Sequence, residues 1–288
     1  MKQIISQISS QLQSAYPEDE ARSLAWWIME ELTGKSRTEL QFGCKDTAFS
    51  SIMQEKSQEI ISRLLHFEPI QYIFGHTLWC GLDLLVTPAT LIPRPETAEL
   101  VERINKPTQT LPEGKALKVL DVGTGSGCIA IALKKAHPSW SVTGIDIFPE
   151  AIEVARENAR RNKVEVHFEV VDIFDFNEKN PKYDIVVSNP PYICESEKTS
   201  MRPNVLNFEP STALFVPDSD PLKFYRRIAE LFSLPLEGKG RERGLFFEIN
   251  EVFGKELKQL LDSLGYTDIQ IHKDIYGKDR IIEARMAR

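Results

Sequence analysis

The most specific feature of the sequence is the run Ser-Asn-Pro-Pro-Tyr at 188–192, which follows an apolar segment at 183–187. Two consecutive prolines restrict the backbone, so the Asn189 side chain and the Pro190 carbonyl point in set directions. A planar NH₂ group donates two hydrogen bonds, and these two oxygens can accept one each. The run therefore predicts a site for a planar amide or amine, with Tyr192 offering a flat face for stacking.

Such a site has a chemical purpose, because an amide nitrogen is a poor nucleophile. Its lone pair is delocalised into the neighbouring carbonyl group. Holding both hydrogens aligns the nitrogen for in-line attack, with the reacting atoms about 3–3.5 Å apart. Neither a metal ion nor a covalent intermediate is needed. The alternative interpretation is a rigid turn after a strand, and a second motif favours the catalytic interpretation.

The second motif is the glycine-rich segment Asp-Val-Gly-Thr-Gly-Ser-Gly at 121–127, between a predicted strand at 117–122 and a predicted helix at 128–135. Glycines there let the backbone turn and pass close to a ligand. A dinucleotide fingerprint needs G-x-G-x-x-G, but here the third glycine comes one position early and Cys128 follows it. The spacing, after an acidic residue, fits S-adenosylmethionine better than NAD. The candidate cofactor-binding residues of this segment are Asp121, Gly123, Thr124, Gly125 and Gly127.

Two further aspartates follow predicted strands. Asp146 ends the strand at 142–146, where a carboxylate can accept hydrogen bonds from both ribose hydroxyls. NAD enzymes use the same position, so Asp146 supports a nucleoside without choosing the cofactor. Asp172 follows the third strand and could accept from an adenine amino group, with Ile173 or Phe174 against the ring. Asp172 could equally be a helix cap or a turn residue.

The elements that must position these residues form an α/β pattern. From residue 117 onward strands and helices alternate, which predicts a mostly parallel sheet covered by helices on both faces. In such sheets ligands lie beyond the carboxyl ends of the strands. The first 66 residues show helical stripes typical of a small bundle, with Gly34 where a helix would stop. Residues 77–86 predict two short strands turning near Cys80-Gly81.

Composition excludes several classes of protein. The chain has 288 residues and a net charge of −7, and its first 87 residues hold 7 Lys and Arg against 11 Asp and Glu, so no nucleic-acid contact is expected. No apolar run exceeds six residues and the N-terminus lacks the features of a signal peptide, so we expect no membrane span and a cytoplasmic protein. The cysteines have no metal-site spacing, and no metal is expected. They are Cys44, Cys80, Cys128 and Cys194.

With both motifs in place, the chain resembles the bacterial peptide chain release factor N5-glutamine methyltransferases (the PrmC/HemK family) over nearly its whole length. The Asn-Pro-Pro-Tyr run alone is shared with DNA adenine methyltransferases, whereas the run Pro-Arg-Pro-Glu-Thr is much more specific. Outside the two motifs, the resemblance is carried by residues 69–75, 91–97, 208–210, 213–214 and 279–280.

The resemblance implies a fold and a reaction. The fold would be a Rossmann-like class I S-adenosylmethionine-dependent methyltransferase domain at 91–288, a helical substrate-recognition domain at 1–75 and a linking β-hairpin at 76–90. The cofactor would be S-adenosyl-L-methionine, and its product S-adenosyl-L-homocysteine. The substrate would be the glutamine of the Gly-Gly-Gln motif of class I release factors, which are the expected partners of a monomeric enzyme.

The resemblance also assigns roles to residues of this chain. The three glycines would line the methionine moiety, Asp146 would bind the ribose, and Asp172 the adenine with Ile173 beside it. Asn189, Pro190 and Tyr192 are the expected catalytic residues, and Asn189 would also touch the cofactor. The expected substrate-binding residues are Asn189, Pro190, Pro191, Tyr192, Arg94 and Glu96.

Three alternatives remain beside this interpretation. Nucleic-acid adenine-N6 methylation also presents a planar NH₂, but such enzymes flip the base and usually carry a basic recognition region, which this chain lacks. In a non-catalytic binding module, we would expect substitutions of motif residues in the glycine segment or at Asn189, and both retain the motif residues. An NAD oxidoreductase is disfavoured by Cys128 and by the lack of an obvious acid for hydride transfer.

Overall fold

A computed structural model describes residues 1–42, 49–106, 116–176, 183–233 and 243–286, so Cys44 lies outside the described residues. The chain divides into two compact units. Unit 1 comprises Met1–Phe74 together with Arg202–Phe208, and unit 2 comprises Gly75–Met201 and Glu209–Arg288.

Unit 1 is helical, as the sequence predicts. The apolar stripe of the first helix, Ile5, Ile8 and Leu12, is buried in a cluster with residues of the second and fourth helices. Gly34 ends the second helix in the left-handed conformation (φ 63°), where its N–H donates to Glu30 O. The helices are α1 (Lys2–Leu12), α2 (Glu18–Thr33), α3 (Arg37–Phe42), α4 (Ser51–Leu65), α5 (Ile70–Phe74) and α9 (Pro203–Phe208).

Unit 2 contains the predicted alternation of strands and helices. Its helices are α6 (Pro95–Asn105), α7 (Cys128–Ala136), α8 (Pro149–Arg161), α10 (Lys223–Ser233) and α11 (Gly254–Ser263), with the 3₁₀ segments η1 (Glu195–Ser200) and η2 (Ser211–Ala213). Its strands are β1 (His76–Trp79), β2 (Leu82–Leu85), β3 (Lys118–Val122), β4 (Ser141–Asp146), β5 (His167–Val170), β6 (Ile185–Ser188), β7 (Ile193–Cys194), β8 (Phe215–Val216), β9 (Arg243–Glu248), β10 (Tyr266–Lys273) and β11 (Asp279–Met286).

The main sheet of unit 2 has the strand order β10-β11-β9-β6-β3-β4-β5. Neighbours from β9 to β5 are parallel, and β11 runs antiparallel to both of its neighbours. The chain adds strands on one side of β3 with β4 and β5 and then on the other side with β6. The order therefore reverses at β3, and a ligand is expected beyond the carboxyl ends of β3, β4 and β6.

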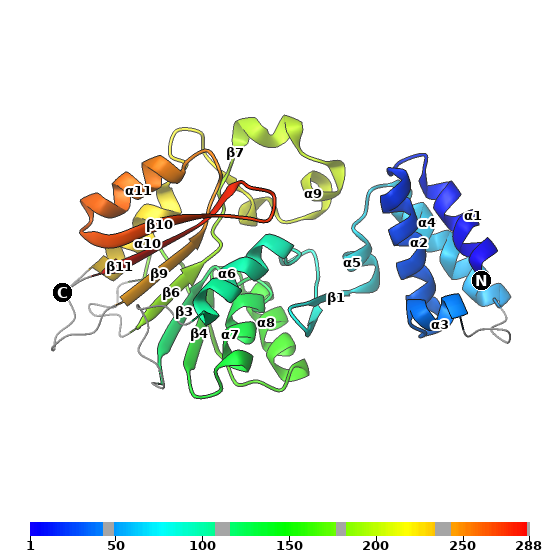
Figure 1. Cartoon of the computed structure of the whole chain (residues 1–288), viewed down its shortest axis with the longest axis horizontal. Helices are drawn as coiled ribbons and strands as arrows, with labels where there is room; N and C mark the ends of the chain where they lie inside the picture. Colours follow the sequence, from blue (N-terminus) through cyan, green and yellow to red (C-terminus); the bar gives the residue numbers. More distant parts are fainter. Residues whose placement is uncertain (43–48, 107–115, 177–182, 234–242, 287–288) are drawn as a thin grey trace. The chain divides into compact units, whose positions relative to one another are not determined.

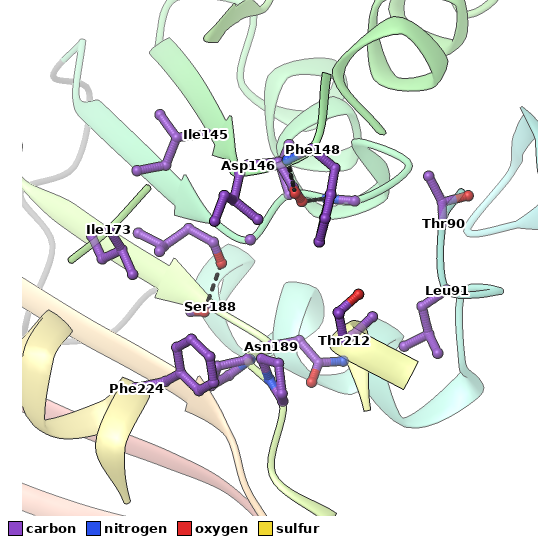
Figure 2. Close-up of a pocket in the computed structure, with 18 of the residues that line it drawn as sticks. Thr90, Leu91, Ile145, Asp146, Phe148, Ile173, Ser188, Asn189, Thr212 and Phe224 are labelled. Atoms are coloured by element: carbon purple, nitrogen blue, oxygen red, sulfur yellow. Dashed lines mark hydrogen bonds between the residues drawn. The ribbon is translucent and has the colours of Figure 1, made fainter. Parts of the chain in front are cut away.

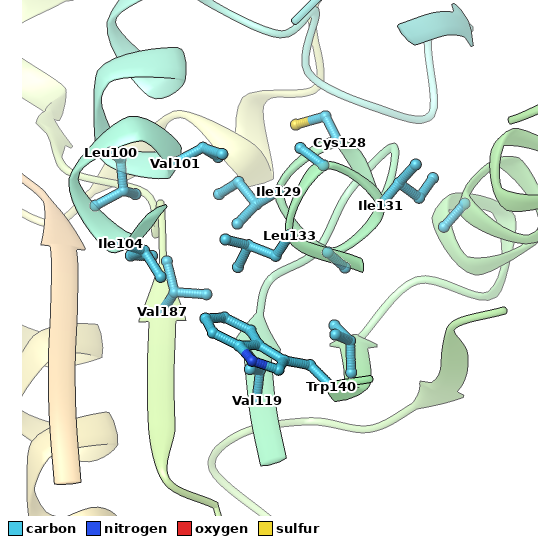
Figure 3. Packing of buried hydrophobic residues seen from close by; sticks show 14 of the residues in the cluster. Leu100, Val101, Ile104, Val119, Cys128, Ile129, Ile131, Leu133, Trp140 and Val187 are labelled. Atoms are coloured by element: carbon cyan, nitrogen blue, oxygen red, sulfur yellow. The ribbon is translucent and has the colours of Figure 1, made fainter. Parts of the chain in front are cut away.

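The central strands of this sheet are buried on both faces, because they are apolar at successive positions. Val119 packs with α6, α7 and α8 on one face, whereas Leu120 packs with α10 and α11 on the other. Figure 1 shows these helices on opposite sides of the sheet, and Figure 3 shows Val119, Leu133 and Val187 packed within the first layer. This buried platform holds the strand ends in fixed positions.

The hairpin predicted near Cys80-Gly81 is confirmed. β1 and β2 pair antiparallel from His76 with Leu85 to Trp79 with Leu82. Cys80 and Gly81 both have positive φ, at 49° and 70°, as a tight two-residue hairpin turn requires. By its contacts the hairpin belongs to unit 2.

None of the helices in the described part of the chain has the length and the apolar character that a membrane span requires.

Gly144 in β4 lies at a closely packed position of the main sheet. A Cβ added there would lie 2.7 Å from the Phe168 ring and 2.8 Å from Thr124 Oγ1. We expect Gly144→Ala to lower the free energy of unfolding by about 1–3 kcal/mol, because an overpacked site must shift its neighbours. Urea denaturation measures the loss. In a Phe168→Leu background the alanine should cost less, and an equal cost in both backgrounds would contradict the clash.

Candidate active site

A cavity of about 460 Å³ lies beyond the carboxyl ends of β3, β4, β5 and β6 in unit 2. Its volume is in the range of ordinary small-molecule sites. Figure 2 shows Asp146, Ile173, Asn189 and Phe224 around this space. The two motifs singled out in the sequence, which lie more than 60 residues apart, therefore meet at one cavity.

The glycine segment forms one wall. The N–H groups of Gly123 and Thr124 both donate to Ile145 O at 2.9 Å, which ties the loop after β3 to the end of β4. Gly123 and Gly125 have φ values of 69° and 53°, and an added Cβ at either would meet nothing within 4 Å. The loop therefore leaves space for a ligand at these glycines.

Gly127 and Asp121 lie behind this wall and do not line the cavity. A Cβ at Gly127 would be 3.1 Å from Ala155 and from Ile131, so this glycine permits close helix packing. Asp121 is fully buried, and its Oδ2 accepts hydrogen bonds from Thr124 Oγ1 and the Ala130 N–H. Both residues thus support the loop from within.

Asp146 and Asp172 line the cavity at the ends of the next two strands. Asp146 Oδ2 accepts from the Gly125 N–H at 2.9 Å, and Oδ1 accepts from the Phe148 N–H at 3.1 Å. Burial raises the pKa of Asp146, and hydrogen bonds from the backbone oppose the rise. Asp172 Oδ1 accepts from the Phe174 N–H at 2.8 Å, so Asp172 has the predicted turn contact as well as a place on the wall. Each carboxylate oxygen keeps capacity for another donor.

The cavity wall beside Asp172 is apolar. Ile173, Phe174 and Phe224 line it, and the two phenylalanine rings contact each other with their centroids 5.4 Å apart. Arg227 of α10 donates to Ile173 O and Phe174 O, which holds the segment in place. Apolar side chains next to carboxylates and a glycine wall match an adenosine with a charged tail, so the residues present fit S-adenosylmethionine.

The predicted amide site lies on the same cavity through Asn189, Pro190 and Pro191, whereas Tyr192 is not among the lining residues. Asn189 Nδ2 donates to Thr97 Oγ1 at 3.2 Å, and no described residue donates to its Oδ1. The Tyr192 hydroxyl donates to Glu248 Oε1 at 3.0 Å. Tyr192 packs against the buried cluster on the Leu120 face of the sheet, which includes residues of α10 and α11.

The segment before α6 provides one cation to the cavity wall. Arg94 lines the cavity, and its guanidinium pairs with the buried Glu209 at 2.5 Å. Glu209 also accepts from the Ile92 N–H, and the Trp79 indole donates to Arg94 O. Glu96 lies in the first turn of α6, away from the lining, where its charge suits the helix N-terminus.

Comparison with known proteins identifies the family. A family model described as a methyltransferase domain matches residues 113–233, and a PrmC N-terminal domain matches residues 3–75. A release factor glutamine methyltransferase from Bacteroides thetaiotaomicron is 45% identical over 285 residues, covering 99% of both chains. This chain belongs to the release factor glutamine methyltransferase family.

A second member of this family, from Flavobacterium psychrophilum, is 41% identical over 98% of both chains. In fold, the chain resembles a methyltransferase from Pyrococcus furiosus at 19% identity, with a TM-score of 0.51 over 79% of this chain and 98% of that one. The predicted Rossmann-like methyltransferase fold is confirmed. Within the part of the chain that is described, no group of His, Cys, Asp and Glu could hold a metal ion.

The structure adds residues that neither the motifs nor the family resemblance had identified. Asn158 in α8 is fully buried, accepts from the Leu85 N–H, and donates to Leu85 O and Ser126 O, so it joins the hairpin to the glycine loop. Its signal in the sequence is a polar residue within the apolar stripe of a helix. Glu248 carries a similar signal, as a charged residue within the apolar run 245–249, whereas Phe224 looks like an ordinary residue of its helix.

We expect Asp121 to make the stability of this family member depend on pH. Burial raises its pKa from 3.8 to about 7, so the folded state binds this proton more tightly than the unfolded state. The resulting stabilisation is present below the unfolded pKa and is lost as the pH rises through about 7. We expect Asp121→Asn, which does not titrate, to gain stability relative to the wild type between about pH 5 and about pH 8.

Urea denaturation at both pH values measures this difference. The exposed Asp19 provides the control, because Asp19→Asn removes a charge without touching the loop. A gap between the wild type and Asp121→Asn that is independent of pH would contradict the assignment.

Proposed function

We propose that this chain transfers a methyl group from S-adenosyl-L-methionine to the side-chain amide nitrogen of the glutamine in the Gly-Gly-Gln motif of class I release factors, with S-adenosyl-L-homocysteine as the second product. The observation that carries the proposal is one cavity that combines the glycine wall and Asp146 with Asn189 and Pro190. The family to which the chain belongs is named for this reaction.

The residues of the cavity divide into two groups. The glycine wall, Asp146, Asp172 and Ile173 would hold the cofactor, which supplies an electrophilic methyl group when bound. Asn189 Oδ1 and the Pro190 carbonyl would each accept one hydrogen of the substrate amide and so fix the direction of its nitrogen. The amide nitrogen loses one proton as it gains the methyl group, and this proton would pass to solvent water, so that Asn189 and Pro190 contribute orientation rather than base catalysis.

Unit 1 is proposed to recognise the release factor. A single glutamine offers little surface, so selectivity requires contacts outside the cavity. The N-terminal part of the chain carries excess acidic residues, and complementary charge would speed association with a partner that has basic surface. We further propose that the enzyme works in the cytoplasm, as a monomer, without binding nucleic acid directly.

The proposed reaction is tested with the purified chain, labelled S-adenosylmethionine and an intact release factor. Label should enter the wild-type factor and be absent from a factor whose Gly-Gly-Gln motif carries Gln→Ala. Label in DNA or RNA and none in the release factor would replace the proposal with adenine methylation.

Asn189→Ala and Asp146→Ala should fail in different ways. Asn189→Ala should lower turnover at least about 100-fold, because the substrate amide is no longer oriented, while S-adenosylhomocysteine binding stays near normal. Asp146→Ala should instead weaken that binding by about 1.5–3 kcal/mol, the usual contribution of hydrogen bonds to a charged group. Calorimetry and single-turnover labelling separate the two effects. Near-normal turnover in Asn189→Ala would refute its role.

Deleting residues 1–74, the N-terminal segment of unit 1, tests recognition. The shortened chain should still bind S-adenosylhomocysteine, because every residue lining the cavity belongs to unit 2. It should methylate an intact release factor far more slowly than the full chain, because the contacts that select the partner are gone. Equal rates for the two chains, with binding of S-adenosylhomocysteine retained, would remove the recognition role.

A further inference from the structure

A buried carboxylate lies directly behind the amide site. Glu248 ends β9 and is 1% exposed. Its Oε2 accepts from Thr97 Oγ1 at 2.6 Å, and its Oε1 accepts from the Tyr192 hydroxyl at 3.0 Å. Thr97 lies in α6 and is 3% exposed, and its oxygen accepts from Asn189 Nδ2 at 3.2 Å. Three elements distant in sequence are thus joined behind one wall of the cavity.

Burial raises the pKa of Glu248, and the hydrogen bonds from Thr97 and Tyr192 and the charge of Arg280 oppose the rise. When Glu248 is ionised, the hydrogen bonds that link Glu248, Thr97 and Asn189 run in only one direction, because an ionised carboxylate only accepts and a threonine hydroxyl has a single hydrogen. Because that hydrogen goes to Glu248, the Thr97 oxygen can act toward Asn189 only as an acceptor. Asn189 must therefore turn its NH₂ toward Thr97, which leaves Oδ1 on the other side of the amide.

The opposite orientation of Asn189 is unfavourable. With Oδ1 against Thr97, two acceptors would face each other unless the hydroxyl turned away from Glu248. A buried carboxylate oxygen would then lose a donor, which costs more than an ordinary hydrogen bond contributes. Tyr192 remains a donor throughout, because burial and the neighbouring Glu248 charge raise its pKa.

We propose that Glu248 and Thr97 are positioning residues that hold the Asn189 amide with its oxygen facing the substrate amide. Glu248 fixes the Tyr192 ring through the same carboxylate. The inference deepens the proposed function and rests on it for the identity of the substrate. The orientation of Asn189 itself is a property of the chain, which can be measured without any substrate.

Thr97→Val and Thr97→Ser form a matched pair for this test. Valine has nearly the shape of threonine but no hydroxyl, whereas serine keeps the hydroxyl. We expect Thr97→Val to lower kcat about 10- to 100-fold, the scale of misplaced reacting groups, with little change in KM for the release factor or in S-adenosylhomocysteine binding. Thr97→Ser should retain turnover within about threefold of the wild type.

A second measurement does not depend on activity. In ¹⁵N-labelled protein, the side-chain NH₂ signal of Asn189 is identified by its absence from Asn189→Ala. Its hydrogens should exchange slowly in the wild type and Thr97→Ser and rapidly in Thr97→Val. Should valine prevent folding, as shown by loss of S-adenosylhomocysteine binding, Thr97→Ala removes the same hydroxyl with a smaller side chain.

The outcomes separate the two proposals. A wild-type chain that leaves release factors unlabelled refutes the proposed function, and the exchange of the Asn189 hydrogens then decides the positioning role alone. Full turnover in Thr97→Val, or equal exchange in all three proteins, overturns the positioning role even when the wild type methylates its substrate.

Discussion

The site depends on the hydrogen bonds that fix the conformation of the glycine-rich loop after β3. Ile145 O accepts from Gly123 and Thr124, Asp121 accepts from Thr124 and Ala130 beneath the loop, and Asn158 binds Ser126 O. The loop contains residues with positive φ that would otherwise sample many conformations. Because these partners come from β3, β4 and α8, the cavity wall is only as rigid as the buried sheet behind it.

Much of this arrangement could be predicted from the sequence because its signals are local. The alternation of apolar strands and helices specified a parallel sheet, and Cys80-Gly81 specified the hairpin turn, since each depends on neighbouring residues. Asp146 and Asn189 could be assigned to one cavity because the ends of parallel strands share one edge of a sheet. The apolar segment at 183–187 forms a strand as well, although β6 begins only at Ile185 and extends to Ser188.

The sequence could not separate residues that face the cavity from residues that support its wall. Asp121 and Gly127 belong to the same motif as Gly123, yet they face the helices behind it. Tyr192 likewise follows Asn189 and Pro190 but turns its hydroxyl toward Glu248. A motif records which residues are adjacent in the chain, whereas the side of the wall that each occupies depends on elements far away, such as β9 and α8.

The buried carboxylate of Glu248 determines the orientation of the Asn189 side-chain amide, which packing alone cannot determine. The oxygen and nitrogen of an asparagine amide are nearly equal in size, so shape does not distinguish its two orientations. Only the donor and acceptor character of the partners does so. A hydroxyl alone would accept either orientation, because it can donate or accept. A hydroxyl whose hydrogen is already committed to Glu248 cannot, so the charge at the end of β9 determines which atom of Asn189 faces the cavity.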